Sequence, residues 1–195
     1  MKLSLFSITL AAEGLSAVAV AISIFHPDRR LWPPPRKHTW EGILMWLLFI
    51  LSAMGIGALG IADWGALALA PWIRLGIGIP LGCAGHALAL WAMATLGIAQ
   101  TFGNEGVLVI RGPYRFSRNP QYLGFILALL GWALLASSVL TLIAALVGVI
   151  PLLLVPLAEE PWLMERLGPS YAAYKQTVPR FIALRLWGQP RADHE

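Results

Sequence analysis

The sequence has 195 residues, of which 58% are hydrophobic and 12% are charged, and its formal net charge is +4. Soluble domains carry about a quarter charged residues, so the composition excludes an ordinary soluble domain and favours a protein with the bilayer as its solvent. The basic residues lie scattered at the ends of apolar segments, which fits anionic lipid headgroups better than nucleic acid, and no nucleic-acid partner is expected.

Five apolar segments are long enough to cross a hydrocarbon core, which needs about 20 residues of helix. Irregular backbone cannot face lipid, so we expect an all-α integral membrane protein with a single domain over residues 1–195. The last two segments are separated by Ser137 and Ser138, which predicts a tight antiparallel helical hairpin. In chain order, the expected spans are residues 3–25, 40–61, 70–96, 121–137 and 139–158.

The positive charges predict the orientation of these spans. Twelve of the 14 basic residues fall in the segments 26–39, 97–120 and 159–195, which lie on one side of the membrane if there are five spans. The other side receives only Lys2 and Arg74. The positive-inside rule therefore places the N-terminus outside and the C-terminus in the cytoplasm, with any chemistry on the cytoplasmic side.

After the fifth span the sequence becomes amphipathic, and residues 159–195 are expected to form a cytoplasmic tail. Pro161 starts a helix well, so the segment PWLMERLG predicts a short separate helix that stops at Gly168. The segment SYAAYKQTV predicts another helix, which ends before Pro179. The segment RFIALRLW mixes arginine with large apolar residues, which is typical of an interfacial helix.

Two polar clusters flank the hairpin of the last two spans. The first is the stretch RGPYRFSRNPQYLG, residues 111–124, where two proline turns hold Arg118 near the membrane surface. The second is the pair Glu159 and Glu160, which opposes the dipole of the preceding helix and borders the bilayer. Anchoring at the interface is the ordinary explanation of either cluster alone. The hairpin topology, however, predicts that Arg118 lies close to Glu160, an arrangement that suits a zwitterionic ligand with additional positive charge.

These two clusters together resemble the isoprenylcysteine carboxyl methyltransferase and phospholipid methyltransferase superfamily of integral membrane enzymes. The family pattern is G-P-Y-x-x-x-R-H-P-x-Y-x-G, a hairpin of spans, and then E-E-x-x-L-x-x-x-x-G-x-x-Y-x-x-Y with a V-P-R ending. The resemblance covers residues 85–182, which form the expected methyltransferase core. The matching positions are Gly112, Pro113, Tyr114, Arg118, Pro120, Tyr122 and Gly124, followed by Glu159, Glu160, Leu163, Gly168, Tyr171, Tyr174, Val178, Pro179 and Arg180.

The resemblance implies S-adenosylmethionine as cofactor and a lipid or prenylated small molecule from the bilayer as methyl acceptor. We expect Arg118 to bind the cofactor carboxylate and a glutamate to bind the cofactor ammonium or ribose hydroxyls. The residues expected to bind the cofactor are Tyr114, Arg118, Asn119, Pro120, Tyr122, Glu159, Glu160, Gly85 and His86. The residues expected to act in catalysis are Glu160 as a base, Tyr122 on the methyl-transfer face, and Asn119.

Two positions depart from the family pattern. A G-x-G element on an earlier span is associated with cofactor binding in phospholipid N-methyltransferases, and the segment CAGHALALWA has Cys83 at the first of these glycines and Gly85 at the second. Asn119 stands where many members have histidine, and an amide cannot titrate. His86 is either a packed core histidine or a group that lines the pocket. The Asn119 variant resembles bacterial members, so we expect a bacterial inner membrane protein.

Methyl transfer from a sulfonium needs positioning rather than a covalent nucleophile or a metal, and no metal site is expected. Methylation of a phospholipid amine is the leading function. Carboxyl methylation of a prenylcysteine-like substrate is an alternative, because a carboxylate is already a nucleophile and needs no base. An NADPH-dependent sterol-type reductase is another, since such enzymes resemble this superfamily in the C-terminal half. A non-catalytic membrane protein of the same fold completes the alternatives.

Overall fold

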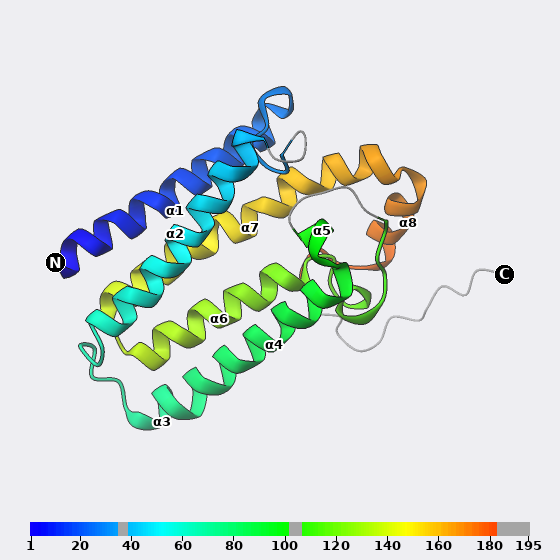
Figure 1. Cartoon of the computed structure of the whole chain (residues 1–195). Coiled ribbons are helices and arrows are strands. Elements are labelled where there is room, and N and C mark those ends of the chain that lie inside the picture. Colours follow the sequence, from blue (N-terminus) through cyan, green and yellow to red (C-terminus); the bar gives the residue numbers. More distant parts are fainter. Residues whose placement is uncertain (35–38, 102–106, 183–195) are drawn as a thin grey trace.

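The computed structural model describes residues 1–34, 39–101 and 107–182, and these residues form helices and connecting segments without a strand. The long helices lie alongside one another in a single bundle (Figure 1). They are α1 (Lys2–Phe25), α2 (Trp40–Ala62), α4 (Ile79–Leu96), α6 (Pro120–Ala136) and α7 (Val139–Leu167). The expected all-α membrane fold is confirmed.

Short elements connect the long helices. The helix α3 (Pro71–Ile73) and the π-helical turn η2 (Arg74–Gly78) lead directly into α4, so that Pro71–Leu96 is one candidate membrane span. The spans predicted at 3–25, 40–61, 70–96 and 121–137 agree with the helices to within two residues. The remaining short elements are η1 (Pro27–Arg29), α5 (Ile98–Thr101), η3 (Gly112–Arg115) and α8 (Pro169–Thr177).

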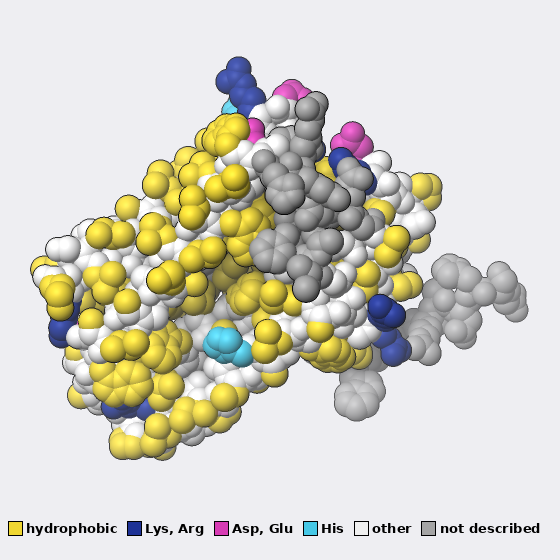
Figure 2. Space-filling model, viewed as in Figure 1, with side chains coloured by type: hydrophobic (Ala, Val, Ile, Leu, Met, Phe, Trp, Pro, Cys, Tyr) yellow, Lys and Arg dark blue, Asp and Glu magenta, His cyan; other side chains and the backbone are white. Residues whose placement is uncertain are grey.

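The bundle has two different ends and an apolar side. Hydrophobic side chains cover much of the long side in Figure 2, and charged side chains lie towards the ends. The N-terminus and the turn between α6 and α7 lie at one end, while η1, α5, η3 and α8 gather at the other (Figure 1). The described parts of the segments 26–39, 97–120 and 159–195, which hold most of the basic residues, therefore lie at the same end of the bundle. This is the arrangement expected if the chain crosses the membrane five times.

The fifth span does not end where the sequence predicts. The helix α7 has 29 residues and continues through Pro161 to Leu167, so the prediction of a separate helix beginning at Pro161 is wrong. A proline removes only one helix hydrogen bond, and the preceding residues Val155 and Ala158 are packed in the core, so the helix continues past Pro161. Gly168 ends the helix with a φ of +55°, as predicted. The interfacial helix predicted for RFIALRLW lies outside the described residues from position 183 onward.

The hairpin between α6 and α7 is as tight as predicted. Ser137 has a left-handed backbone (φ +52°), and the Ser138 hydroxyl oxygen accepts a hydrogen bond of 3.1 Å from the Thr141 amide. The Ser138 hydroxyl donates to Asp63 at 2.8 Å, and the Lys2 ammonium lies 2.9 Å from the same carboxylate. These hydrogen bonds hold the pKa of Asp63 below its ordinary value, so the carboxylate is charged and ties three chain segments together.

The helices α4 and α6 pack through glycines, which let the two backbones approach closely. A Cβ atom on Gly124 would lie 2.6 Å from the amide nitrogen of Ala89 and 2.7 Å from the carbonyl oxygen of Gly85. A Cβ atom on Gly85 would in turn lie 2.6 Å from the carbonyl oxygen of Gly124. No flexible side chain can move aside at these points, so any larger residue must separate the helices.

Replacing Gly124 with alanine is therefore expected to destabilise the protein by about 2 kcal/mol, as overpacking of a close contact does. Thermal unfolding of the purified protein in detergent measures the effect. Gly57 is the matched control, because it lies inside α2 and a Cβ atom there would meet nothing within 4 Å. Equal melting temperatures for the Gly124→Ala and Gly57→Ala proteins would contradict this account of the helix crossing.

Candidate active site

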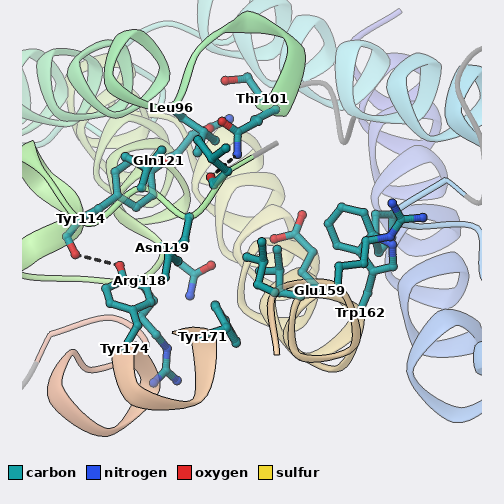
Figure 3. A pocket seen from close by; sticks show the side chains of 18 of the residues that line it. Leu96, Thr101, Tyr114, Arg118, Asn119, Gln121, Glu159, Trp162, Tyr171 and Tyr174 are labelled. Atoms are coloured by element: carbon teal, nitrogen blue, oxygen red, sulfur yellow. Dashed lines mark hydrogen bonds between the residues drawn. The ribbon is translucent and has the colours of Figure 1, made fainter. Parts of the chain in front are cut away.

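A cavity of about 300 Å3 lies at the end of the bundle that carries α5, η3 and α8. Its wall includes all four tyrosines of the sequence, Tyr114, Tyr122, Tyr171 and Tyr174. Figure 3 shows Glu159 on the side of α7, across the cavity from the residues of η3 and the start of α6. The other polar residues of the wall are Gln100, Thr101, Arg118, Asn119, Gln121 and Arg166.

Three of the tyrosines, Tyr114, Tyr171 and Tyr174, lie together where η3 meets α8, and all three are buried. We refer to them as the tyrosine frame. The Tyr174 hydroxyl donates a hydrogen bond of 2.7 Å to the carbonyl oxygen of Tyr114, and the rings of Tyr171 and Tyr174 meet edge to face with 6.0 Å between centroids. Burial raises the pKa of Tyr174 to about 12 and raises the pKa values of Tyr114 and Tyr171 still further. The three phenols are therefore neutral at physiological pH, and they add aromatic surface to the wall of the cavity.

Glu159 is the carboxylate of the cavity wall. Its Oε1 atom accepts two hydrogen bonds, one of 2.6 Å from the Tyr122 hydroxyl and one of 2.7 Å from the Trp32 indole nitrogen. From the described residues, Oε2 receives no hydrogen bond, and Figure 3 shows the carboxylate directed into the cavity. One oxygen is thus fixed by the protein, which leaves the other for a ligand.

Glu160 has different surroundings from its neighbour. Arg118 Nη2 lies 2.7 Å from Glu160 Oε1, and Arg180 contacts both carboxylate oxygens at 2.8 Å through Nε and Nη2. The side chains of Arg118 and Glu160 are only 6% and 5% exposed. The predicted approach of Arg118 to Glu160 is confirmed. The structure nevertheless places Glu160 in an ion cluster behind the cavity wall, where its oxygens are already bound by arginines.

Arg118 and Asn119 form hydrogen bonds with backbone carbonyl groups of residues 175–180, near the end of the described part of the chain. Arg118 Nη1 donates to the carbonyl oxygens of Lys175 (2.8 Å) and Val178 (3.0 Å), while its backbone amide donates to Pro179 at 2.9 Å. The Asn119 side-chain amide donates to the carbonyl oxygen of Arg180 at 3.0 Å. Both residues touch the cavity, but these donors hold the segment after α8 against the start of α6.

The other predicted site residues lie elsewhere. Pro120 is buried as the first residue of α6 and does not line the cavity. Gly85 packs against α6, and His86 is exposed with Nδ1 only 2.8 Å from the Gly82 carbonyl oxygen of its own helix. Cys83 is also exposed. The glycine element expected to bind the cofactor therefore faces the neighbouring helix and the lateral surface instead of the cavity.

The sequence also did not reveal Trp32, which contacts the cavity carboxylate Glu159 from outside the cavity wall. Trp32 and Glu159 are 127 positions apart in the sequence. The sequence has nine tryptophans, and no local pattern distinguishes Trp32 from the other eight. Tryptophans near the ends of spans are typical of the aromatic belt at a membrane interface. The indole is instead only 3% exposed and lies beside the cavity.

Comparisons with known proteins find a matching family model and a similar curated protein. A family model described as phospholipid methyltransferase matches residues 73–170, about half of the chain. Among curated proteins, the chain is similar to the steroid 5-alpha-reductase DET2 of Solanum lycopersicum, with 27% identity over 111 residues that cover 57% of this chain and 43% of that protein. The chain thus aligns with less than half the length of this relative. No solved structure matches the chain significantly.

The matched region begins in α3 and runs to the start of α8, so it contains the α4–α6 crossing, the α6–α7 hairpin and the glutamate pair. Both N-terminal helices, Trp32 and the two tyrosines of α8 lie outside it. By the extent of this match and the helical membrane bundle that carries it, the chain belongs to the phospholipid methyltransferase family.

Proposed function

We propose that the protein transfers a methyl group from S-adenosylmethionine to a lipophilic acceptor in the membrane, with a phospholipid amine as the substrate class. The observation that carries this proposal is the cavity whose wall contains the carboxylate of Glu159 together with four tyrosines. A carboxylate and aromatic faces both attract cations. The sulfonium and ammonium of the cofactor are cationic, and so is a protonated lipid amine.

The residues of the cavity fit the cofactor. A volume of about 300 Å3 lies at the lower end of the range for small-molecule sites. Oε2 of Glu159 is available for the cofactor ammonium or ribose hydroxyls, and the rings of Tyr114 and Tyr171 would lie against its sulfonium or adenine. When bound, S-adenosylmethionine would supply an electrophilic methyl group, so the protein needs no covalent nucleophile.

The chain's own residues would orient the reactants and exclude water. Tyr122 hydrogen-bonds Glu159 and so fixes the direction of the carboxylate, while Trp162 and Leu163 add apolar wall beside it. An amine must lose its proton before it attacks the methyl group. A carboxylate oxygen can accept two hydrogen bonds, so we assign the acceptance of that proton to Oε2 of Glu159, beside its bond to the cofactor, instead of to Glu160, whose oxygens are bound by two arginines.

Arg118, Asn119 and Glu160 receive positioning roles in this proposal. Their hydrogen bonds and ion pairs hold α8 and the segment that follows it, and α8 supplies Tyr171 and Tyr174 to the cavity. Loss of this attachment would open the tyrosine frame. In this proposal Arg118 does not bind the cofactor carboxylate, because its terminal nitrogens already donate hydrogen bonds to Glu160 and to backbone carbonyl oxygens.

We further propose that the cavity end of the bundle faces the cytoplasm of a bacterial inner membrane and that the N-terminus lies outside. The distribution of basic residues supports this orientation. Residues 85–182 would form the methyltransferase core of a single membrane domain over 1–195, and residues 159–195 would include the cytoplasmic tail. The acceptor would then reach the cavity from the membrane.

A reductase using NADPH is the second candidate function, and the similarity to the steroid 5-alpha-reductase favours it. Ligand binding separates the two functions. S-adenosylmethionine at about 100 times its dissociation constant is expected to stabilise the purified protein by about 2.7 kcal/mol, whereas NADPH is expected to give no stabilisation. Thermal unfolding in detergent measures both, and incubation with methyl-labelled cofactor and total membrane lipid identifies the product. Stabilisation by NADPH alone would overturn the methyltransferase proposal.

A further inference from the structure

The N-terminal helices carry no part of the family match, yet one residue between them reaches the cavity carboxylate. Trp32 lies in the segment that joins α1 to α2, and its indole nitrogen donates a hydrogen bond of 2.7 Å to Glu159 Oε1. The indole is 3% exposed, so water does not compete for this donor. A hydrogen bond to a charged acceptor away from water is among the stronger kinds.

The orientation of Trp32 is itself fixed by both N-terminal helices. Ser23 of α1 accepts hydrogen bonds from the backbone amides of Leu31 (2.9 Å) and Trp32 (3.0 Å). From α2, the rings of Trp46 and Phe49 meet the indole edge to face, with centroids at 6.1 Å and 5.8 Å. The indole N–H therefore points at Glu159 from a rigid support.

The two donors to Glu159 come from different halves of the chain and reach the same oxygen. Tyr122, inside the family match, and Trp32, outside it, both donate to Oε1. Two donors on one oxygen restrict rotation of the carboxylate, and this keeps Oε2 towards the cavity. With one donor removed, the plane of the carboxylate would rotate more freely, and the oxygen that faces the cavity would be held less firmly.

We infer that Trp32 is a positioning residue of the methyl-transfer site, which holds the Glu159 carboxylate so that Oε2 faces the ligand. This inference rests on the proposed function. It gives the first two helices a role beyond anchoring, because they form the support from which the indole reaches the site.

Indole NMR signals test the contact without any ligand. In protein labelled with 15N-tryptophan, the signal lost in the Trp32→Phe variant is expected to shift in the Glu159→Gln variant. The Glu165→Gln variant is the matched control, because Glu165 is an exposed carboxylate on the same helix, and it is expected to leave that signal in place. Should Trp32→Phe fail to fold, Glu159→Gln and Tyr122→Phe must move one common indole signal that Glu165→Gln does not move.

Affinity for S-adenosylmethionine tests the role. Trp32→Phe keeps an aromatic ring but removes the donor, and it is expected to weaken binding about tenfold, as loss of one hydrogen bond to a charged group does. Trp72→Phe, at a tryptophan that is 67% exposed, is expected to bind as the wild type does. An unmoved Trp32 signal in Glu159→Gln, or equal affinities for Trp32→Phe and the wild type, would overturn the inference. Absence of binding by the wild type would instead overturn the proposed function, and the role of Trp32 with it, while the NMR signals still report the contact.

Discussion

Replacing Glu159 with glutamine is expected to lower the affinity for S-adenosylmethionine about 100-fold, or about 2.7 kcal/mol, and to stop methyl transfer. Glutamine retains an oxygen that can accept hydrogen bonds from Trp32 and Tyr122, so the fold should survive. The negative charge that faces the cavity is lost, and with it the attraction for a cationic ligand. Equilibrium binding of the labelled cofactor in detergent measures the affinity, and transfer of label to lipid measures the activity.

The control for this change is Glu165→Gln. Glu165 lies on the same helix, α7, and its side chain is exposed, so the net charge of the protein changes equally. This variant is expected to bind and react as the wild type does. Wild-type affinity in the Glu159→Gln protein would show that the cavity carboxylate does not touch the ligand, and the proposed site would have to be abandoned.

Replacing Glu160 with alanine is expected to cost about 3–5 kcal/mol, because it leaves the guanidinium of Arg118 buried without a counter-charge. Arg118 is 6% exposed and lies 2.7 Å from the Glu160 carboxylate. For a chain of this length the loss corresponds to a melting temperature about 10 °C lower. We also expect faster proteolysis of α8, since Glu160 holds the segment after it through Arg180.

Lys175→Ala is the control for the ion cluster. The Lys175 ammonium lies 3.4 Å from Glu160 and its side chain is 44% exposed, so the pair contributes less than about 0.5 kcal/mol. Thermal unfolding followed by tryptophan fluorescence compares the two variants. Equal melting temperatures for the Glu160→Ala and Lys175→Ala proteins would mean that the ion cluster does not stabilise the fold.

Much of the fold could be predicted because the bilayer limits the possible structures. Apolar runs of about 20 residues gave the first four spans to within two residues, and Ser137 with Ser138 located the hairpin. From the hairpin alone followed the approach of Arg118 to Glu160, which are 42 positions apart. The end of α7 was missed, because proline usually begins a helix there while tertiary packing carried the helix through Pro161.

The separate surroundings of Glu159 and Glu160 follow from helix geometry. Consecutive residues on an α-helix point about 100° apart, so the two carboxylates cannot both face one cavity. Which of them does so depends on the rotation of α7 about its axis, which packing in the bundle sets and no local pattern encodes. The motif around Gly85 likewise predicts a residue at the cofactor. In the structure Gly85 packs against Gly124, and this helix packing explains a glycine at that position.

The length of α7 bears on what the protein can distinguish in its acceptor. A helix of 29 residues is about 44 Å long, whereas the hydrocarbon layer is about 30 Å thick. Glu159 lies 20 residues, or about 30 Å, beyond Val139, so in the proposed orientation we expect it at the boundary between the hydrocarbon layer and the headgroups. On the proposed function we therefore expect the site to distinguish acceptors by their headgroups, and acceptors that differ only in the number of carbons in their acyl tails to react at equal rates.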